Sequence, residues 1–226
     1  MSAEQIKSLS ITSYDTVPYI MSTAGQGASG RRVTIDDYAA AAATPLQSTK
    51  SIYRMLRFPT GAIVKALVMA TDKALDSGTP TLAFDVNVVW ASGTNPAWCP
   101  PQFQLASLSL ATTEAVIPTT AYDGTTTTTV SAYSSPNKAF GTVTPTSNSA
   151  AYGPTNITFN GSQSANSGAL DLKNLTSMPM WQLLGFVDGR GNPADPGGFF
   201  DIMLYVSTAA NTGVAGNLWM EMTYVI

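Results

Sequence analysis

The clearest pattern in this chain is the succession of three apolar runs separated by turn residues between residues 51 and 90. One apolar run occupies 52–58 and ends at Pro59-Thr60-Gly61, a second covers 62–70, and a third covers 81–90. The apolar positions of the third run are Leu82, Phe84, Val86, Val88 and Trp90. Alternation with a period of two predicts a strand that has one face in a core and one in water. This segment therefore predicts three consecutive β-strands joined by short turns.

Strong strand patterns return in the last third of the chain, at 180–187, 199–207 and 217–226. The last of these is apolar on both faces, which predicts a central strand or one covered by a neighbouring subunit. Together the runs indicate about eight strands, the number typical of a two-sheet sandwich or jelly roll. The predicted fold class is all-β, a jelly-roll-like β-sandwich.

The first 50 residues have a different pattern and predict an N-terminal arm ahead of a body at 51–226. Thr34 is a suitable N-cap, Asp36 and Asp37 would lie in the first helical turn, and an alanine run follows at 39–43. These features predict one short helix near 34–43. Residues 119–168 are rich in Thr, Ser, Asn, Gly and Pro and predict long polar loops with short hairpins.

Composition indicates a protein whose surface carries little charge. Of the 226 residues 44% are hydrophobic and 11% charged, below the usual quarter for soluble domains. A single domain of this length buries roughly 70% of the surface that its unfolded chain exposes. A surface made largely of small polar residues suits a protein that packs against other subunits.

The net charge of −3 provides no basic field for nucleic acid, so no nucleic-acid partner is expected. Residues 1–73 nevertheless hold eight of the eleven Lys and Arg residues against five acids. Arg31 and Arg32 are therefore the candidates for contact with an acidic partner surface, the alternative being a solvated pair beside a glycine-rich hinge. The N-terminus lacks an apolar signal region and no run of 18 apolar residues occurs, so synthesis in the cytoplasm without a membrane segment is expected.

The residue types present predict neither an enzyme nor a cofactor. The chain has no histidine and a single cysteine, Cys99, so His-activated nucleophiles and an internal disulfide are excluded. The G-x-G-x-x-G match at 25–30 lacks the strand and long helix of a dinucleotide site. Asp76-Ser77-Gly78 resembles an aspartic-protease loop but occurs once, and it equally suits a turn.

Three acids near the C-terminus raise the question of a calcium site. Asp188, Asp195 and Asp201 lie close together in sequence. Arg190 and Pro193 break the EF-hand template there, so acidic turn residues are favoured over a metal site.

The segment from Tyr53 to Lys65, followed by Ala74-Leu75-Asp76-Ser77-Gly78, resembles a pattern of small structural proteins of tailed bacteriophages. The resemblance covers residues 50–90. It implies a β-sandwich or jelly-roll decoration (cement) protein, commonly trimeric, that binds the major capsid protein on the outer surface of the virion.

Two functions are expected from these features. The first is a cement protein whose arm orders over capsid subunits on binding and stiffens the shell, so that deletion of residues 1–33 abolishes capsid binding. The alternative is a receptor-binding or fibre-associated module whose loops at 119–168 contact a host glycan or protein.

Overall fold

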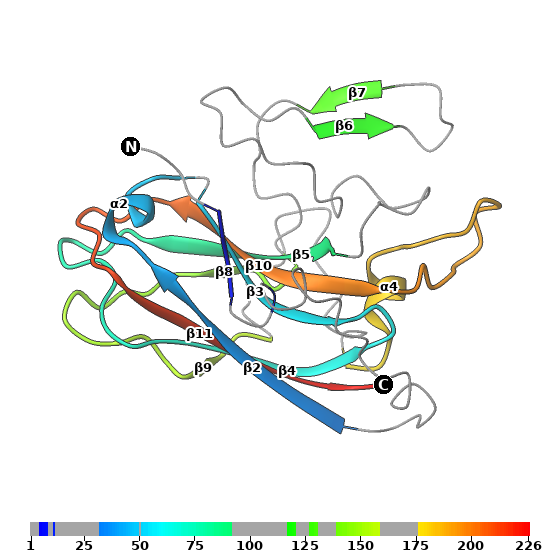
Figure 1. Cartoon of the computed structure of the whole chain (residues 1–226), viewed down its shortest axis with the longest axis horizontal. Helices are drawn as coiled ribbons and strands as arrows, with labels where there is room; N and C mark the ends of the chain where they lie inside the picture. The colour runs from blue at the N-terminus through cyan, green and yellow to red at the C-terminus, as the bar shows by residue number, and fades with distance from the viewer. Residues whose placement is uncertain are drawn as a thin grey trace.

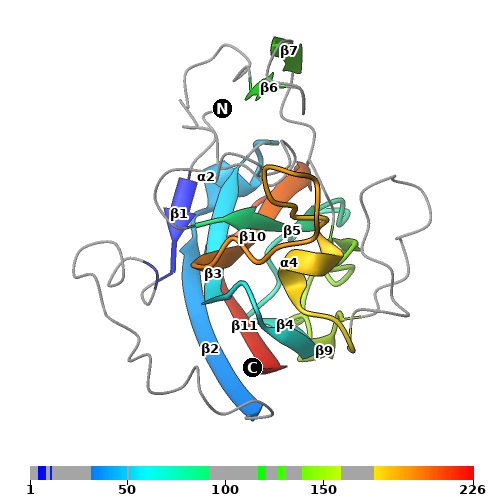
Figure 2. The same cartoon turned by 90° about the vertical axis from the view of Figure 1, so that its right-hand side faces the viewer.

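The computed structural model describes residues 5–8, 11, 32–49, 51–91, 117–120, 127–130, 139–158 and 176–226. Within these residues two β-sheets pack face to face around one hydrophobic core, as Figures 1 and 2 show from two sides. A separate two-stranded sheet pairs β6 (Ile117–Thr120) with β7 (Thr127–Val130). The predicted all-β sandwich is confirmed.

The first sheet, here called sheet A, has the strand order β1-β3-β10-β5-β8. Strand β1 runs parallel to β3, and the other neighbours are antiparallel. The strands span β1 (Gln5–Lys7), β3 (Ile52–Pro59), β10 (Phe199–Thr208), β5 (Ala83–Trp90) and β8 (Thr142–Val143).

The second sheet, sheet B, has the order β2-β11-β4-β9 and is antiparallel throughout. The strands span β2 (Arg32–Ala41), β11 (Gly216–Val225), β4 (Ile63–Thr71) and β9 (Thr155–Asn156). Strand β11 lies between β2 and β4, which confirms the prediction of a central strand. Strand β2 forms one edge of the sheet (Figure 2).

The helix predicted near 34–43 is wrong, because β2 occupies this segment. Ten residues of β2 pair with β11, from Arg32 opposite Val225 to Ala41 opposite Gly216. Alternate residues Val33, Ile35, Ala39 and Ala41 pack against the core, a period that a helix could not provide. Tertiary pairing here outweighs the helix propensity of the alanines.

The predicted boundary of the arm at residue 50 changes for the same reason. Residues 32–49 belong to the sandwich, and α2 (Ala43–Leu46) buries Leu46 in its core. Near the N-terminus β1 also pairs with β3, so the described part of the predicted arm belongs to the sheets. Apart from residues 5–8 and Ile11, residues 1–31 lie outside the described residues.

The strand predicted at 180–187 is also wrong, because a helix and a turn occupy 180–185 and only Val187 makes an isolated bridge, to Pro193. A short helix, α4 (Met180–Leu183), follows Pro179, whose extended backbone forms the N-cap. The Met180 and Trp181 N–H groups donate to the carbonyls of Ala62 and Thr60, which ties the helix to the turn between β3 and β4. Met180 in this helix and Phe186 after it are both buried and cover one end of the core.

Aromatic side chains fill the core near that end. The ring centroids of Phe186 and Phe200 lie 5.4 Å apart, those of Trp90 and Phe200 5.8 Å, and those of Phe58 and Phe200 6.0 Å. These separations are typical of favourable edge and tilted packing. Phe200 therefore joins residues of β3, β5 and the segment after α4.

The predicted polar loop region at 119–168 contributes strands as well as loops. Its described residues 139–158 supply β8 to sheet A and β9 to sheet B, and the β6–β7 hairpin also falls in this region. Jelly-roll connectivity stays a prediction, because the link between β5 and β6 lies outside the described residues. Among the described residues, no helix is long and apolar enough to span a membrane.

Replacement of Gly153 by alanine is expected to lower the free energy of unfolding by about 2 kcal/mol. Gly153 has φ of +72°, and an added Cβ would meet the Thr155 N atom at 2.8 Å and also the Met69 carbonyl oxygen. Gly185 is the matched control, with φ of +76° and no atom within 4 Å of the added Cβ. Gly185→Ala should cost about 1 kcal/mol, because only backbone strain applies. Urea denaturation measures both, and equal losses would contradict a steric role for Gly153.

Candidate functional site

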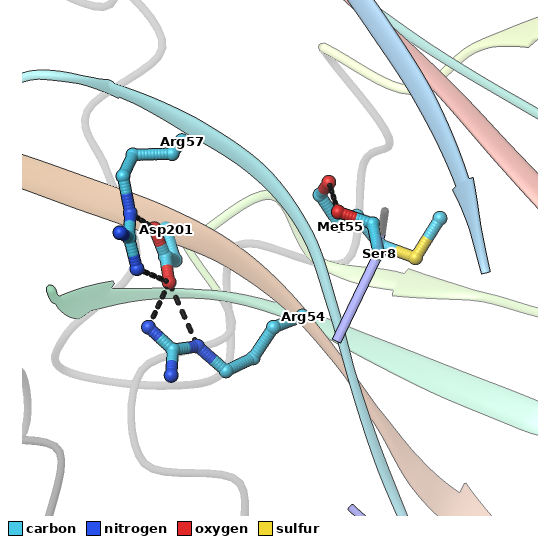
Figure 3. A network of polar contacts seen from close by, with 5 residues as sticks. All are labelled: Ser8, Arg54, Met55, Arg57 and Asp201. Carbon is cyan, nitrogen blue, oxygen red and sulfur yellow. Dashed lines mark hydrogen bonds and ion pairs between the residues drawn. The ribbon is translucent and has the colours of Figure 1, made fainter. Parts of the chain in front are cut away.

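The outward face of sheet A carries a buried cluster of two arginines and one aspartate. Arg54 and Arg57 on β3 both reach Asp201 on β10 (Figure 3). Arg54 Nε lies 2.7 Å from Asp201 Oδ2, and Arg57 donates through Nε at 2.8 Å to Oδ1 and through Nη2 at 3.1 Å to Oδ2. A second Arg54 nitrogen, Nη2, also contacts Oδ2. The carboxylate therefore has charged partners at both oxygens.

An irregularity in the strand register brings the two arginines onto one face. Residues three apart on a regular strand point to opposite faces. The register between β10 and β3 shifts at Ile202 and Met203, so that Met55 is an extra residue and both Met55 and Leu56 lie in the core. Such a bulge leaves backbone N–H and C=O groups of the extra residue without a partner in the hydrogen bonding between the two strands.

Ser8 satisfies the carbonyl at this bulge. Its hydroxyl donates to the Met55 carbonyl oxygen at 2.6 Å, and its backbone N–H donates to the Arg54 carbonyl at 2.7 Å (Figure 3). Because Ser8 directly follows β1, the N-terminal strand and the bulge support each other. The arginine cluster thus depends on contacts from the first residues of the chain.

Further polar side chains extend this layer across β5. Asp85 accepts a hydrogen bond from the Thr142 hydroxyl at 2.6 Å and lies opposite Tyr205 in the strand pairing. Burial, with a smaller contribution from the charge of Asp85, raises the pKa of Tyr205 to about 12. The phenol therefore remains protonated near neutral pH. Together these contacts support a role in holding β3, β10, β5 and β8 in register.

Asp76, from the protease-like triplet, lies in a loop where backbone N–H groups surround its carboxylate. Oδ2 accepts from Thr81 at 2.9 Å and from Asn211 at 3.0 Å, and Oδ1 accepts from Thr212 at 2.9 Å. Leu82 and Gly78 donate over longer distances of 3.3 and 3.4 Å. Burial alone would raise the pKa of Asp76, but the backbone donors outweigh it and the pKa is lowered. Asp76 therefore joins the loop before β5 to the loop between β10 and β11.

The three acids considered for calcium have separate partners. Asp188 accepts the N–H groups of Arg190 and Asn192 within its own turn, and these bonds lower its pKa. Asp195 accepts from the Thr60 hydroxyl at 2.6 Å, whereas Asp201 belongs to the arginine cluster on a strand. Across the described ranges, no three His, Cys, Asp or Glu side chains are grouped as a metal site requires.

Of the two candidate contact residues, Arg32 begins β2 and is exposed, and Arg31 lies outside the described residues. Arg32 belongs to the outward face of sheet B, here called the outer B face. We define this face by the residues of β2, β11 and β4 that point away from the core. They are Arg32, Thr34, Asp36, Tyr38, Ala40, Asn217, Trp219, Glu221, Thr223, Val225, Ile63, Lys65, Ala66, Val68 and Ala70.

The outer B face carries exposed aromatic surface together with charges of both signs, among them Arg32, Asp36 and Glu221. Tyr38 is 52% exposed, the only large hydrophobic side chain so exposed in the described part of the chain. In the strand pairing Tyr38 lies beside Trp219, which in turn lies beside Ala70. Tyrosine and tryptophan are enriched where proteins bind one another. The sequence prediction missed this surface because it assigned β2 to a helix, although Val33 and Ile35 alternate with polar residues.

Comparisons with models of protein families, with curated proteins and with solved structures found no significant match to this chain.

Proposed function

We propose that this protein is a virion structural protein that binds the outer surface of a tailed-bacteriophage capsid as a decoration or cement protein. The observation that carries the proposal is the outer B face, a sheet surface on which the exposed Tyr38 lies beside Trp219. The resemblance described above supplies the virion context. Its residues form β3, the turn at Pro59-Thr60-Gly61, β4 and the Asp76 loop.

In this proposal the outer B face lies against the major capsid protein. A ligand that binds only the assembled shell stabilises it by mass action, without any covalent step. Each bound copy would add contacts between shell subunits, and a broad sheet face suits a broad protein surface. No nucleic acid, membrane or cofactor takes part in this mechanism.

The contact is assigned to the outer B face because the described part of the predicted arm belongs to the sandwich. Deletion of residues 1–33 would remove β1, Ser8 and the first two residues of β2. This deletion would therefore disturb the body as well as any arm. Point substitutions on the outer B face give a more selective test.

Tyr38→Asp is expected to weaken binding to purified capsid shells by about tenfold or more, because it replaces the exposed aromatic side chain of this face with a charge. Co-sedimentation of the variant with shells, at fixed salt, measures the effect. Arg190→Asp is the control, since Arg190 is exposed in a turn and does not belong to the outer B face. Unchanged binding of the Tyr38 variant would argue against this surface.

Copy number separates the proposal from the receptor-binding alternative, in which loops at 119–168 contact a host surface. Quantitative mass spectrometry of purified particles should find the chain in simple proportion to the major shell protein. A few copies per particle would favour a tail or fibre role, and absence from particles would overturn a virion function.

A further inference from the structure

Among the described strands, β2 pairs on one side only, and its other edge has a specific arrangement of charge. It pairs with β11 on one side, and no other described strand pairs with its opposite side. The strand is ten residues long and contains neither proline nor glycine. Long edges of this kind are templates for pairing with another chain, and proteins usually interrupt or cover them.

The first half of this edge lies away from β1. Arg32 pairs with Val225 at the end of β11, whereas β1 pairs with the start of β3. Figures 1 and 2 show β2 running along the side of the sandwich, with its first residues at the end where the C-terminus lies. Residues 32–36 therefore present their backbone groups at an end that no described strand covers.

The side chains of residues 32–36 are complementary to themselves in reverse order. Arg32, Thr34 and Asp36 are exposed on the outer B face, and Val33 and Ile35 point toward the core side. Reversal of the segment about Thr34 exchanges Arg32 with Asp36 and Val33 with Ile35. Each residue then meets one of opposite charge or of similar shape.

We propose that two copies of this chain pair antiparallel through their β2 edges, with Thr34 on the two-fold axis. Arg32 then lies opposite the partner's Asp36, twice by symmetry, and Val33 lies opposite the partner's Ile35. The two four-stranded B sheets become one continuous sheet. Both outer B faces join into one surface of doubled extent.

Charge selects this register over its neighbours. Directly opposed residues of antiparallel strands share a face, and opposite charges there stabilise the pair while like charges destabilise it. A pairing centred on Asp36 would bring two aspartates together at the axis. A pairing centred on Tyr38 would leave Arg32 without an acid opposite it. Only the Thr34-centred register forms charge pairs on both sides of the axis.

The pairing concerns the free protein and does not depend on capsid binding. It has two-fold symmetry and so differs from the trimer that the phage resemblance implies. Native mass spectrometry of the full chain should give a species of twice the 23.7 kDa chain mass. This measurement uses no capsid, so the absence of a dimer would not contradict the proposed decoration function. In the same way, a chain that does not bind capsids could still form the dimer.

Charge reversal provides the sharpest test. Arg32→Asp alone places acids opposite acids, and Asp36→Arg alone places bases opposite bases, so each should raise the dimer dissociation constant about tenfold or more. An equimolar mixture of these two variants should form a heterodimer, since each chain now complements the other. The double variant Arg32→Asp/Asp36→Arg should restore the homodimer. Sedimentation velocity at matched concentrations measures all four samples.

Disulfide trapping tests the register directly. Opposed residues in antiparallel strands have Cα atoms about 4.5–5.5 Å apart, within the range that a disulfide spans. In a Cys99→Ser background, Thr34→Cys should cross-link two chains under mild oxidation. Tyr38→Cys, on the same face of the same strand, should not, because its two copies would lie about 25 Å apart.

A wild-type chain that remains monomeric, or forms only trimers, would overturn the proposal. So would loss of the dimer in the double charge variant, or equal cross-linking at residues 34 and 38. Circular dichroism of each variant tests whether the sandwich is intact. A dimer in the mixture of the two single variants, or in the double variant, shows that the single variants lost the pairing and not the fold.

Discussion

Replacement of Asp201 by alanine is expected to lower the free energy of unfolding by about 3–5 kcal/mol, as is usual when one partner of a buried ion pair is removed. Asp201 is fully buried, and the side chains of Arg54 and Arg57 are only 5% and 7% exposed. Without the carboxylate, two buried guanidinium groups lose the charged acceptor that they share. Guanidinium denaturation, fitted to a two-state model, measures the loss.

A triple replacement separates charge burial from packing. Arg54→Met/Arg57→Met/Asp201→Leu removes the two positive charges and the negative charge together. It should lower the free energy of unfolding by less than Asp201→Ala alone. Asp195→Ala is the control, because Asp195 is exposed and accepts hydrogen bonds from neutral donors, the Thr60 hydroxyl and the Gly197 N–H. It should change the unfolding free energy by about 1 kcal/mol or less. A triple variant less stable than the single variant would show that the ion cluster is itself strongly stabilising.

Replacement of Asp76 by asparagine should cost about 3 kcal/mol, because bonds to a charged acceptor are stronger than bonds to a neutral one. The carboxylate of Asp76 accepts backbone N–H groups from both joined loops. Asparagine keeps the shape of the side chain, but its amide nitrogen would face those donors. Thermal and urea denaturation both report the change.

The pH dependence of stability gives a second measure of Asp76. The folded pKa lies below the ordinary value of 3.8, so the stabilisation is present above that value and is lost as the pH falls through the folded pKa. The wild type should therefore lose stability below about pH 4 more steeply than Asp76→Asn. Asp188→Asn is the control, because Asp188 also accepts backbone N–H groups but within one exposed turn. Parallel acid profiles for wild type and Asp76→Asn would contradict the role of this carboxylate.

Local alternation predicted the strands that carry most of the fold. The segments at 52–58, 62–70, 81–90, 199–207 and 217–226 correspond to β3, β4, β5, β10 and β11. In each, apolar side chains form a run of strand length, and turn residues mark the ends; the period of two is regular in β5 and is interrupted by a bulge in β3. The central place of β11 followed from its two apolar faces.

The errors arose where local preference and tertiary pairing disagree. In β2 the alanines and Thr34 favour a helix locally, and only the pairing with β11 makes the segment a strand. The alternation of Val33, Ile35, Ala39 and Ala41 was present in the sequence but weak, since alanine fits both structures. At 180–187 the effect of Pro179 was underestimated.

The polar cluster of sheet A could not have been predicted from spacing. Asp201 is 144 and 147 residues from its arginine partners, and its sequence neighbours Asp188 and Asp195 suggested a different grouping. The bulge that turns Arg54 and Arg57 to one face depends on the register with β10, which no local pattern specifies. Of the predicted contact residues, Arg32 could be placed, on an edge strand.

The order of sheet B also governs when the fold can form during synthesis. Strand β2 ends at residue 41, but its neighbour β11 begins at residue 216. At a usual rate of about 5–20 residues per second, β2 leaves the ribosome roughly ten seconds or more before its pairing partner exists. Arg32, Asp36 and Asp37 keep the waiting strand charged, as gatekeeper residues do in aggregation-prone segments. If synthesis stopped before β11, sheet B would lack the strand between β2 and β4. Such a fragment could not form the second sheet and would be degraded.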